Sequence, residues 1–148
     1  MAEALRVCIQ RLDTDTPLPT YAYEGDAGLD LRAACDCVLP PGGRAPVPTG
    51  IKIAIPSGYA GFVLPRSGMA IRKGLSLVNT PGLIDSQYRG EVTVLAINHD
   101  RGESILIEKG ERIAQLVILQ VPQVELVEDE GLDKTARNEK GFGSRGAQ

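Results

Sequence analysis

The most regular strand pattern in the chain reads Glu91-Val92-Thr93-Val94-Leu95-Ala96-Ile97-Asn98. Successive side chains of a strand point to opposite faces of its sheet, so alternate residues share a face. Val92, Val94 and Ala96 form one apolar face, and Leu95 and Ile97 make the other face largely apolar as well. We therefore predict a strand that is buried on both sides.

Shorter patterns of the same kind occur along the chain, separated by turns rich in Gly and Pro. They predict strands at residues 5–9, 29–33, 51–55, 60–64, 104–107 and 113–121. One short helix is expected at residues 67–73, ended by Gly74. Short strands with turn signals about every eight to twelve residues favour an all-β fold, as a sandwich or a jelly-roll-like barrel.

Composition limits the kind of protein this can be. The 148 residues are enough for one domain of ordinary size, and the core must be aliphatic because aromatics make up only 4%. A net charge of −3 gives no general attraction to nucleic acid or to an anionic membrane. No stretch reaches the roughly 18 apolar residues of a membrane span. We therefore expect no nucleic-acid or membrane partner.

The cysteines favour a cytoplasmic location. Cys8, Cys35 and Cys37 are an odd set, whereas a structural zinc site normally uses four Cys or His ligands and His99 is the only histidine. We interpret them as reduced, partly buried thiols of a cytoplasmic protein, and the chain start shows no secretory signal. The alternative is a redox pair of Cys35 and Cys37, whose spacing places both on one strand face.

The last 21 residues differ in composition from the rest. Residues 128–148 are charged and Gly-rich, with only Leu132 and Phe142 as sizeable apolar side chains. Such a segment cannot alone bury enough surface to offset the entropy of ordering. It is either a disordered tail or a flexible arm that orders over a ligand. Arg137 and the glycines that follow favour the arm, so we predict a barrel domain at 1–127 and an arm at 128–148.

One loop carries the chemistry most plainly. It reads Gly82-Leu83-Ile84-Asp85-Ser86-Gln87-Tyr88-Arg89-Gly90, and it follows Asn79 and Pro81. A carboxylate, an aromatic ring and a guanidinium lie between two glycines. This set is typical of a loop that binds an anionic, ring-bearing ligand and acts on it.

Two further segments suit phosphate. Pro65-Arg66-Ser67-Gly68 places a guanidinium, a hydroxyl and main-chain N–H groups at the predicted helix start. The alternative is that Ser67 is only a helix N-cap. Residues 141–146 match G-x-G-x-x-G, but no helix follows, so this is not a dinucleotide site. Its N–H groups and Ser144 suit phosphate oxygens instead.

Two polar residues lie inside predicted strands. Asp30 is either an outward-facing surface residue or a carboxylate that holds the water ligands of a metal ion. Gln115 needs a partner, since an unsatisfied buried amide costs roughly 1–3 kcal/mol. The partner of the Gln115 amide is either a ligand phosphate or a group of the protein core.

Taken together and in order, these segments resemble the five motifs of the homotrimeric dUTPases. The matching segments are Ala27-Gly28-Leu29-Asp30-Leu31, Pro65-Arg66-Ser67-Gly68, Asn79 with residues 82–90, Gly110-Glu111-Arg112-Ile113-Ala114-Gln115, and Arg137 with Gly141-Phe142-Gly143-Ser144. The resemblance spans about residues 26–146. It implies a distorted jelly-roll-like β-barrel, the dUTPase-like β-clip, assembled as a homotrimer with active sites between subunits.

The resemblance also implies an activity. The family hydrolyses dUTP to dUMP and pyrophosphate with Mg²⁺, which limits uracil in DNA and supplies dUMP for dTMP synthesis. Asp85 would be the general base that activates water against the α-phosphorus. Tyr88 would pack on the deoxyribose and exclude a 2′-hydroxyl. The uracil would lie against Asn79, Leu83, Ile84 and Thr93.

The remaining motifs would hold the triphosphate. Arg66, Ser67 and Gly68 would bind phosphates, and Gln115 would contact the α-phosphate region. Asp30 would anchor the water of a Mg²⁺ ion that is held mainly by phosphates. In the arm, the expected substrate contacts are Arg137, Phe142, Gly143 and Ser144.

The arm departs from the family pattern at three positions. Arg145 stands where a small hydroxyl residue is usual, and Asn138 and Lys140 stand where glycines are common. Two alternatives to a dUTPase remain, namely a dCTP deaminase-like enzyme of the same fold and a non-catalytic nucleotide-binding regulator. The pattern Asp85-x-x-Tyr88-Arg89-Gly90 favours the dUTPase.

Overall fold

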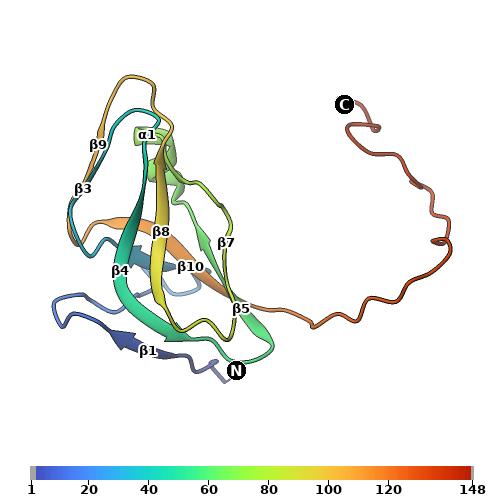
Figure 1. Ribbon diagram of the computed structural model, residues 1–148, viewed down its shortest axis with the longest axis horizontal. Helices are drawn as coiled ribbons and strands as arrows, with labels where there is room; N and C mark the ends of the chain where they lie inside the picture. The colour runs from blue at the N-terminus through green and yellow to red at the C-terminus, as the bar shows by residue number, and fades with distance from the viewer. Residues whose placement is uncertain (1–2, 148) are drawn as a thin grey trace.

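Eleven elements make up the body of the chain (Figure 1). The computed structural model describes residues 3–147, so Met1, Ala2 and Gln148 of the predicted domain and arm lie outside the described residues. The strands are β1 (Cys8–Arg11), β2 (Leu29–Arg32), β3 (Cys37–Leu39), β4 (Arg44–Ala54), β5 (Tyr59–Leu64), β6 (Leu75–Leu77), β7 (Gly82–Ile84), β8 (Glu91–Asn98), β9 (Ile105–Ile107) and β10 (Arg112–Gln120), and the helix is α1 (Ser67–Lys73).

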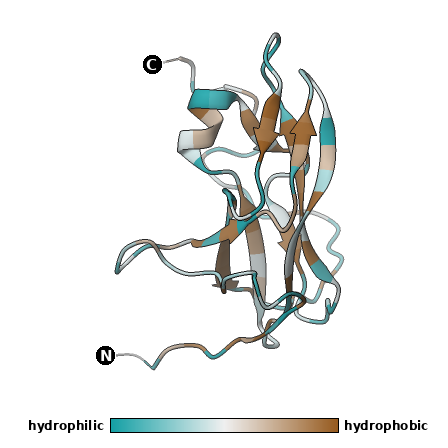
Figure 2. Ribbon diagram, turned by 90° about the vertical axis from the view of Figure 1, so that its left-hand side faces the viewer, coloured by the Kyte–Doolittle hydropathy of each residue, from teal (hydrophilic) through white to brown (hydrophobic). Residues whose placement is uncertain are grey.

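The strands form three antiparallel sheets that do not close into one barrel. Their orders are β1-β4-β8-β6, β2-β10-β5-β7 and β3-β9. Each strand other than β1 contributes at least one buried apolar side chain, and Figure 2 shows that hydrophobic residues concentrate on the strands. The prediction of an all-β fold with one short helix is therefore confirmed for residues 3–147.

The core is aliphatic, as the composition predicts. It is built from Leu, Ile, Val, Ala and Met side chains of all three sheets, of α1 and of the adjoining loops. The largest fully buried apolar side chains are Leu31, Leu39, Ile51, Leu75, Ile107, Ile113, Val47, Val92 and Val94. Because such side chains are worth about 1.5–3 kcal/mol each when fully buried, this cluster is the main source of the stability that holds the site.

Strand β8 differs from its prediction in one respect. Val92, Val94 and Ala96 are buried, but Thr93 is exposed and Leu95 is 39% exposed. The prediction of burial on both sides is therefore wrong for the single chain. The second face is apolar because of Leu95 and Ile97, yet within the chain it is not covered by another layer.

The prediction for the N-terminal strand is also wrong, in its bounds and in its burial. The alternation of residues 5–9 predicts a half-buried strand, whereas β1 starts at Cys8 and all four of its residues are exposed. It pairs along only one edge, with residues 51–54 of β4. The strands β3, β6 and β7 have only three residues each. They are too short for a periodic signal, and the sequence pattern does not predict them.

Strand β4 is longer than predicted because it continues through two prolines. It starts at Arg44 and includes Pro46 and Pro48. Proline has no N–H and is normally restricted to strand edges. Here residues 44–48 pair with β8 on one side only, since β1 pairs with residues 51–54. A register shift between Pro48 and Lys52 separates the two halves of the strand.

The helix α1 begins and ends where the sequence predicts. It ends at Lys73, and Gly74 adopts a left-handed conformation with φ of 72° and closes the last turn by donating to the Ala70 carbonyl. Its N-cap is Arg66, without a side-chain cap hydrogen bond. The alternative that Ser67 is an N-cap is therefore wrong, and Ser67 is the first helical residue.

The chain after β10 leaves the body (Figure 1). Residues 121–147 contain neither helix nor strand, and nearly all are exposed. They include the large apolar side chains of Leu126, Leu132 and Phe142. Within residues 3–147 no helix is long and apolar enough to cross a membrane.

Candidate functional site

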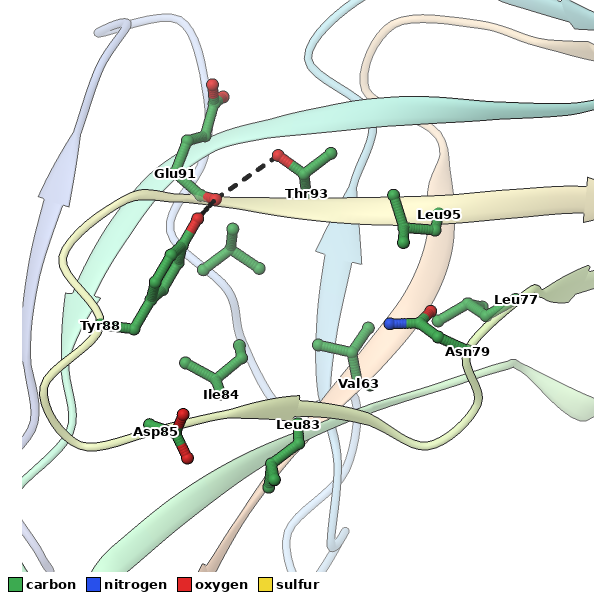
Figure 3. Close-up of a pocket in the computed structure, with 12 residues that line it drawn as sticks. Val63, Leu77, Asn79, Leu83, Ile84, Asp85, Tyr88, Glu91, Thr93 and Leu95 are labelled. Atoms are coloured by element: carbon green, nitrogen blue, oxygen red, sulfur yellow. Dashed lines mark hydrogen bonds between the residues drawn. The ribbon is translucent and has the colours of Figure 1, made fainter.

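The loop predicted to carry the chemistry lines a cavity of about 200 Å³, which we call the loop pocket (Figure 3). Its lining includes the six residues outside the arm that were predicted to contact the base, the sugar and the attacking water, namely Asn79, Leu83, Ile84, Asp85, Tyr88 and Thr93. Small-molecule sites commonly measure about 300–1,000 Å³. The loop pocket therefore has room for one part of a nucleoside triphosphate and not for all of it.

Strand pairing fixes where Asp85 stands. Ile84 is buried and pairs with Gly61 of β5, which fastens the end of β7 to the sheet. Asp85 follows at once and is exposed at the strand end. Its carbonyl accepts a hydrogen bond from the N–H of Tyr88 at 3.1 Å, which closes a turn. The carboxylate thus leaves a rigid strand and faces solvent beside the pocket.

Arg89 holds the loop itself. Its Nη1 donates to the carbonyl of Ser86 at 2.7 Å and to that of Tyr88 at 3.0 Å. These bonds tie the guanidinium to the main chain of its own turn. The geometry therefore favours a structural role for Arg89.

Tyr88 is held at the other end of its ring. Its hydroxyl donates to the Glu91 carbonyl at 2.9 Å, and the Glu91 carboxylate accepts from the N–H of Gly50 at 2.9 Å. Figure 3 shows the Tyr88 ring beside Asp85, with Asn79 toward the opposite end of the pocket. The pocket floor includes Val63 and Ile84, which are buried and apolar. The cavity can thus take a flat ring with a polar edge at one end.

A second cavity lies over β2, β10 and the start of α1. We call this the arginine pocket, and its volume is about 440 Å³. Five predicted phosphate and metal residues line it: Asp30, Arg66, Ser67, Gly68 and Gln115. The sequence separates these residues by up to 85 positions, but the register of β10 with β2 places Gln115 opposite Asp30. The structure therefore brings together three of the five motifs here.

Asp30 lies between two guanidinium groups. Its carboxylate oxygens are 3.7 Å from Arg66 Nε and 3.2 Å from Arg112 Nε. The Asp30 side chain is only 14% exposed, so the alternative of an outward-facing surface residue is wrong. Arg66 also donates from Nη1 to the Arg112 carbonyl at 3.1 Å. The carboxylate and this bond hold both cations toward one cavity without neutralising their combined charge.

Gln115 has a partner within the protein. Its Nε2 donates to the Pro65 carbonyl at 3.0 Å, directly before Arg66. Among the described residues, no buried side-chain nitrogen or oxygen lacks a hydrogen bond. The Gln115 Nε2 group therefore has a partner without a ligand, and the side chain still lines the arginine pocket.

Several lining residues are not assigned from the sequence. Arg112 and Gly28 line the arginine pocket, and Glu91 lines the loop pocket. Arg112 sits inside one of the quoted motifs, and its position directly before the strand predicted at residues 113–121 was the available signal. The sequence gave no signal for Glu91, because its contact with Tyr88 is made by its main-chain carbonyl.

The arm residues lie apart from both pockets. Arg137, Phe142, Gly143 and Ser144 line neither cavity, and Phe142 is fully exposed. Arg137 donates to the Lys140 carbonyl within the arm at 2.7 Å. Asn138, where glycine is common, has a φ of 49°, a conformation that Asn tolerates better than most residues. The single chain therefore does not bring the arm to its own pockets.

The thiols and the acidic residues offer no separate metal centre. No cluster of three or more His, Cys, Asp or Glu side chains in residues 3–147 could hold a metal ion. The three cysteines are free, and only Cys37 is partly covered while Cys8 and Cys35 are exposed. The expectation of partly buried cysteines thus holds for Cys37 alone.

Comparison with known proteins places the chain in a family. A family model described as dUTPase matches residues 14–146. The deoxyuridine 5'-triphosphate nucleotidohydrolase of Streptomyces avermitilis is 52% identical over 142 residues, which cover 96% of this chain and 81% of that protein. The corresponding protein of Corynebacterium glutamicum is 52% identical over 146 residues, which cover 99% and 98% of the two chains.

Solved structures of dUTPases have a similar fold. A mutant dUTPase of Staphylococcus bacteriophage 80alpha with dUpNHpp has a TM-score of 0.89 at 30% identity, covering 97% of this chain and 99% of that one. A mutant dUTPase of phage phi11 of S. aureus, described for the coordination of a structural Mg(II) ion, has a TM-score of 0.80 at 25% identity, covering 88% and 100%. The fold is therefore the distorted jelly-roll-like β-clip. The chain belongs to the dUTPase family and is a dUTP diphosphatase.

Proposed function

We propose that the chain hydrolyses dUTP to dUMP and pyrophosphate by attack of an Asp85-activated water on the α-phosphorus. The observation that carries this is the loop pocket, where Asp85 and Tyr88 stand beside a ring-sized cavity that holds Asn79. A positioned carboxylate that is ionised at neutral pH can take a proton from water, which is worth about 10²–10⁴-fold in rate.

The nucleoside part would fill the loop pocket. Uracil would lie against Leu83, Ile84 and Thr93, and Asn79 would read its polar edge. The Tyr88 ring would pack on the deoxyribose, where an added 2′-hydroxyl would collide. Its fixed hydroxyl, bound to the Glu91 carbonyl, supports this role because the ring cannot easily move aside.

The triphosphate would lie in an arginine pocket. Arg66, Ser67, Gly68 and Gln115 line that cavity, and guanidinium groups bind phosphate oxygens in a bidentate geometry. Arg112 joins this set because its Nε is 3.2 Å from Asp30. In the arm, Arg137, Gly143 and Ser144 would close over the phosphates, and Phe142 would cover the uracil.

The two pockets support assembly as a homotrimer. They share no lining residue, so the groups that read the nucleoside and those that bind phosphate form separate halves in one chain. A complete site would combine the loop pocket of one subunit with the arginine pocket of another. The uncovered apolar face of β8 is a surface that a second copy could bury.

Magnesium fits this site as a ligand of the substrate. Because residues 3–147 hold no cluster of three metal-ligating side chains, the ion would be held mainly by phosphates and water. Bound there, it would neutralise charge on the triphosphate. Asp30 is the carboxylate that lines the phosphate cavity beside Arg66, so it would accept hydrogen bonds from metal-bound water.

The test is pyrophosphate release from dUTP, dTTP, dCTP and UTP under the same conditions. We expect dUTP to be preferred by orders of magnitude, and the proposal fails if dUTP is not hydrolysed. Ammonia release from dCTP would identify a deaminase instead. If the chain hydrolyses dUTP as proposed, its activity would limit uracil in DNA and supply dUMP for dTMP synthesis.

A further inference from the structure

Gly90 lies at the point where the catalytic loop enters β8, directly beneath the ring of Tyr88. A Cβ atom at Gly90 would lie 2.6 Å from Tyr88 Cζ and 2.9 Å from Cε1, and it would also overlap the Tyr88 hydroxyl. Carbon atoms in good contact are about 3.5–4.0 Å apart. The Tyr88 ring therefore occupies the space that any side chain at position 90 would need.

The backbone does not require glycine at this position. The glycines with a left-handed conformation include Gly74 and Gly110, whereas Gly90 is not among them. An alanine could therefore adopt the Gly90 backbone without strain. What glycine provides here is space, and the group that uses the space is the far end of the Tyr88 side chain.

That end of the ring is also the end that is fixed. The Tyr88 hydroxyl donates to the Glu91 carbonyl at 2.9 Å, one residue beyond Gly90. A side chain at position 90 would push the ring away from the main chain and break this hydrogen bond. Because the displaced atoms belong to one movable side chain, the body of the fold can remain unchanged while the ring moves.

We infer that Gly90 is a specificity-determining residue: its missing side chain lets the Tyr88 ring lie against the main chain and so sets how closely that ring approaches the sugar. The inference rests on the proposed function, in which Tyr88 excludes a 2′-hydroxyl. It adds that discrimination between deoxyribose and ribose depends on a residue that touches no substrate. Gly90 acts on specificity through the position of Tyr88.

The experiment compares kcat/KM for dUTP and for UTP in the wild type, in Gly90→Ala and in Gly102→Ala. Gly102 is a matched control because a Cβ there would meet no atom within 4 Å and its backbone is not left-handed. We expect Gly90→Ala to raise the UTP-to-dUTP ratio of kcat/KM by about tenfold or more, as for other small changes in pocket shape. Gly102→Ala should leave the ratio unchanged. An unchanged ratio in Gly90→Ala overturns the inference.

Repeating the substitution in a variant that lacks the Tyr88 ring shows whether Gly90→Ala changes the UTP-to-dUTP ratio through Tyr88. In Tyr88→Ala, which lacks the ring, adding Gly90→Ala should change the ratio no further. If Gly90→Ala alone does not fold, the Tyr88→Ala/Gly90→Ala double variant should fold, and its failure would overturn the inference. A wild type that does not hydrolyse dUTP overturns the proposed function and the inference together. A wild type that does, with an unchanged ratio in Gly90→Ala, overturns the inference alone.

Discussion

Asp85 owes its position to residues on both sides of it. Ile84 is buried and paired with β5, and Tyr88 closes the turn after Asp85 through its N–H. Arg89 then fastens the same turn by two hydrogen bonds to main-chain carbonyls. The carboxylate is exposed, but the backbone that carries it is held at three points. In the proposed mechanism, a carboxylate held in this way needs little reorganisation before it orients a water molecule.

Replacing Asp85 by Asn should therefore separate chemistry from binding. We expect kcat on dUTP to fall by at least about a hundredfold, because the base is lost, while little contact area changes. Affinity for dUpNHpp should stay within about an order of magnitude. Steady-state kinetics and calorimetric titration measure the two quantities. Wild-type kcat in this variant would remove Asp85 from the mechanism.

Several residues proposed to act through their side chains could be named from the sequence, whereas Arg112 and the residues that act through main chain or space could not. Asp85, Tyr88 and Arg66 are recognisable because few structural positions need their chemistry. Glu91 accepts the Tyr88 hydroxyl with its carbonyl, and every residue has a carbonyl. Asp30 could be placed in a site from the sequence, but its two arginine partners could not be identified. Their contacts depend on how the strands pair, and the local sequence does not contain that information.

Among the elements, the turn between β8 and β9 is built around one carboxylate. Asp100 Oδ2 accepts hydrogen bonds from the N–H groups of Glu103 at 2.7 Å and Gly102 at 3.1 Å. These bonds, that of Glu103 first, lower the pKa of Asp100 below its ordinary value. Buried Asn98 supports the same turn, since its Oδ1 accepts from the Asp100 N–H at 2.8 Å.

The lowered pKa of Asp100 predicts a pH-dependent effect of Asp100→Asn. A carboxyl group with a depressed folded pKa stabilises the fold above its unfolded pKa, about 3.9, and loses this effect as pH falls through the folded pKa. The variant should therefore melt below the wild type at pH 7, and the difference should shrink as pH falls below about 4. Thermal melting at constant protein concentration measures it. Asp133→Asn removes the same charge from the arm and is the control, and a gap that widens toward acid pH would contradict the assignment.

The arm is the element whose role depends most on assembly. Deleting residues 137–148 should lower kcat by at least about a hundredfold, because donors around the phosphates and the cover over the base are lost together. The trimer should remain, since the body sheets lie outside the deleted part. Sedimentation and kinetics on dUTP test both statements. Monomers after the deletion would show that the arm holds the subunits together.

Element prediction worked where a pattern was long enough to show a period. Residues 91–98 and 67–73 coincide with β8 and α1. It failed for β3, β6 and β7, where three residues carry no period, and for β1, whose alternation suggests a burial that does not occur. In this region only residues 51–55 were predicted as a strand, whereas β4 begins at Arg44 and includes Pro46 and Pro48. Residues 44–48 of β4 pair with another strand on one side only, and this depends on the tertiary structure and cannot be seen in the local sequence.

At the scale of the whole molecule, the division into two pockets makes a clear prediction about mixed assemblies. Asp85→Asn damages the loop pocket, and Arg66→Ala damages the arginine pocket. If each site combines pockets from two subunits, random mixing of the two inactive variants restores about a quarter of the sites. We expect that share of wild-type activity after mixed refolding. Separate refolding followed by mixing is the control, and no recovery in the mixed sample would place both halves of a site in one subunit.

Strand β4 has a further consequence for how copies of the chain meet. Over residues 44–48 one edge of the strand has no partner strand, although the Pro48 carbonyl accepts a hydrogen bond from the Ala34 N–H at 2.8 Å. An open edge can template pairing with another chain and start aggregation. Pro46 and Pro48 carry no N–H, so they withhold donors from any strand that approaches. The two prolines thereby disfavour fibril-like growth along this edge, while the exposed face of β8 stays free for the proposed trimer contact.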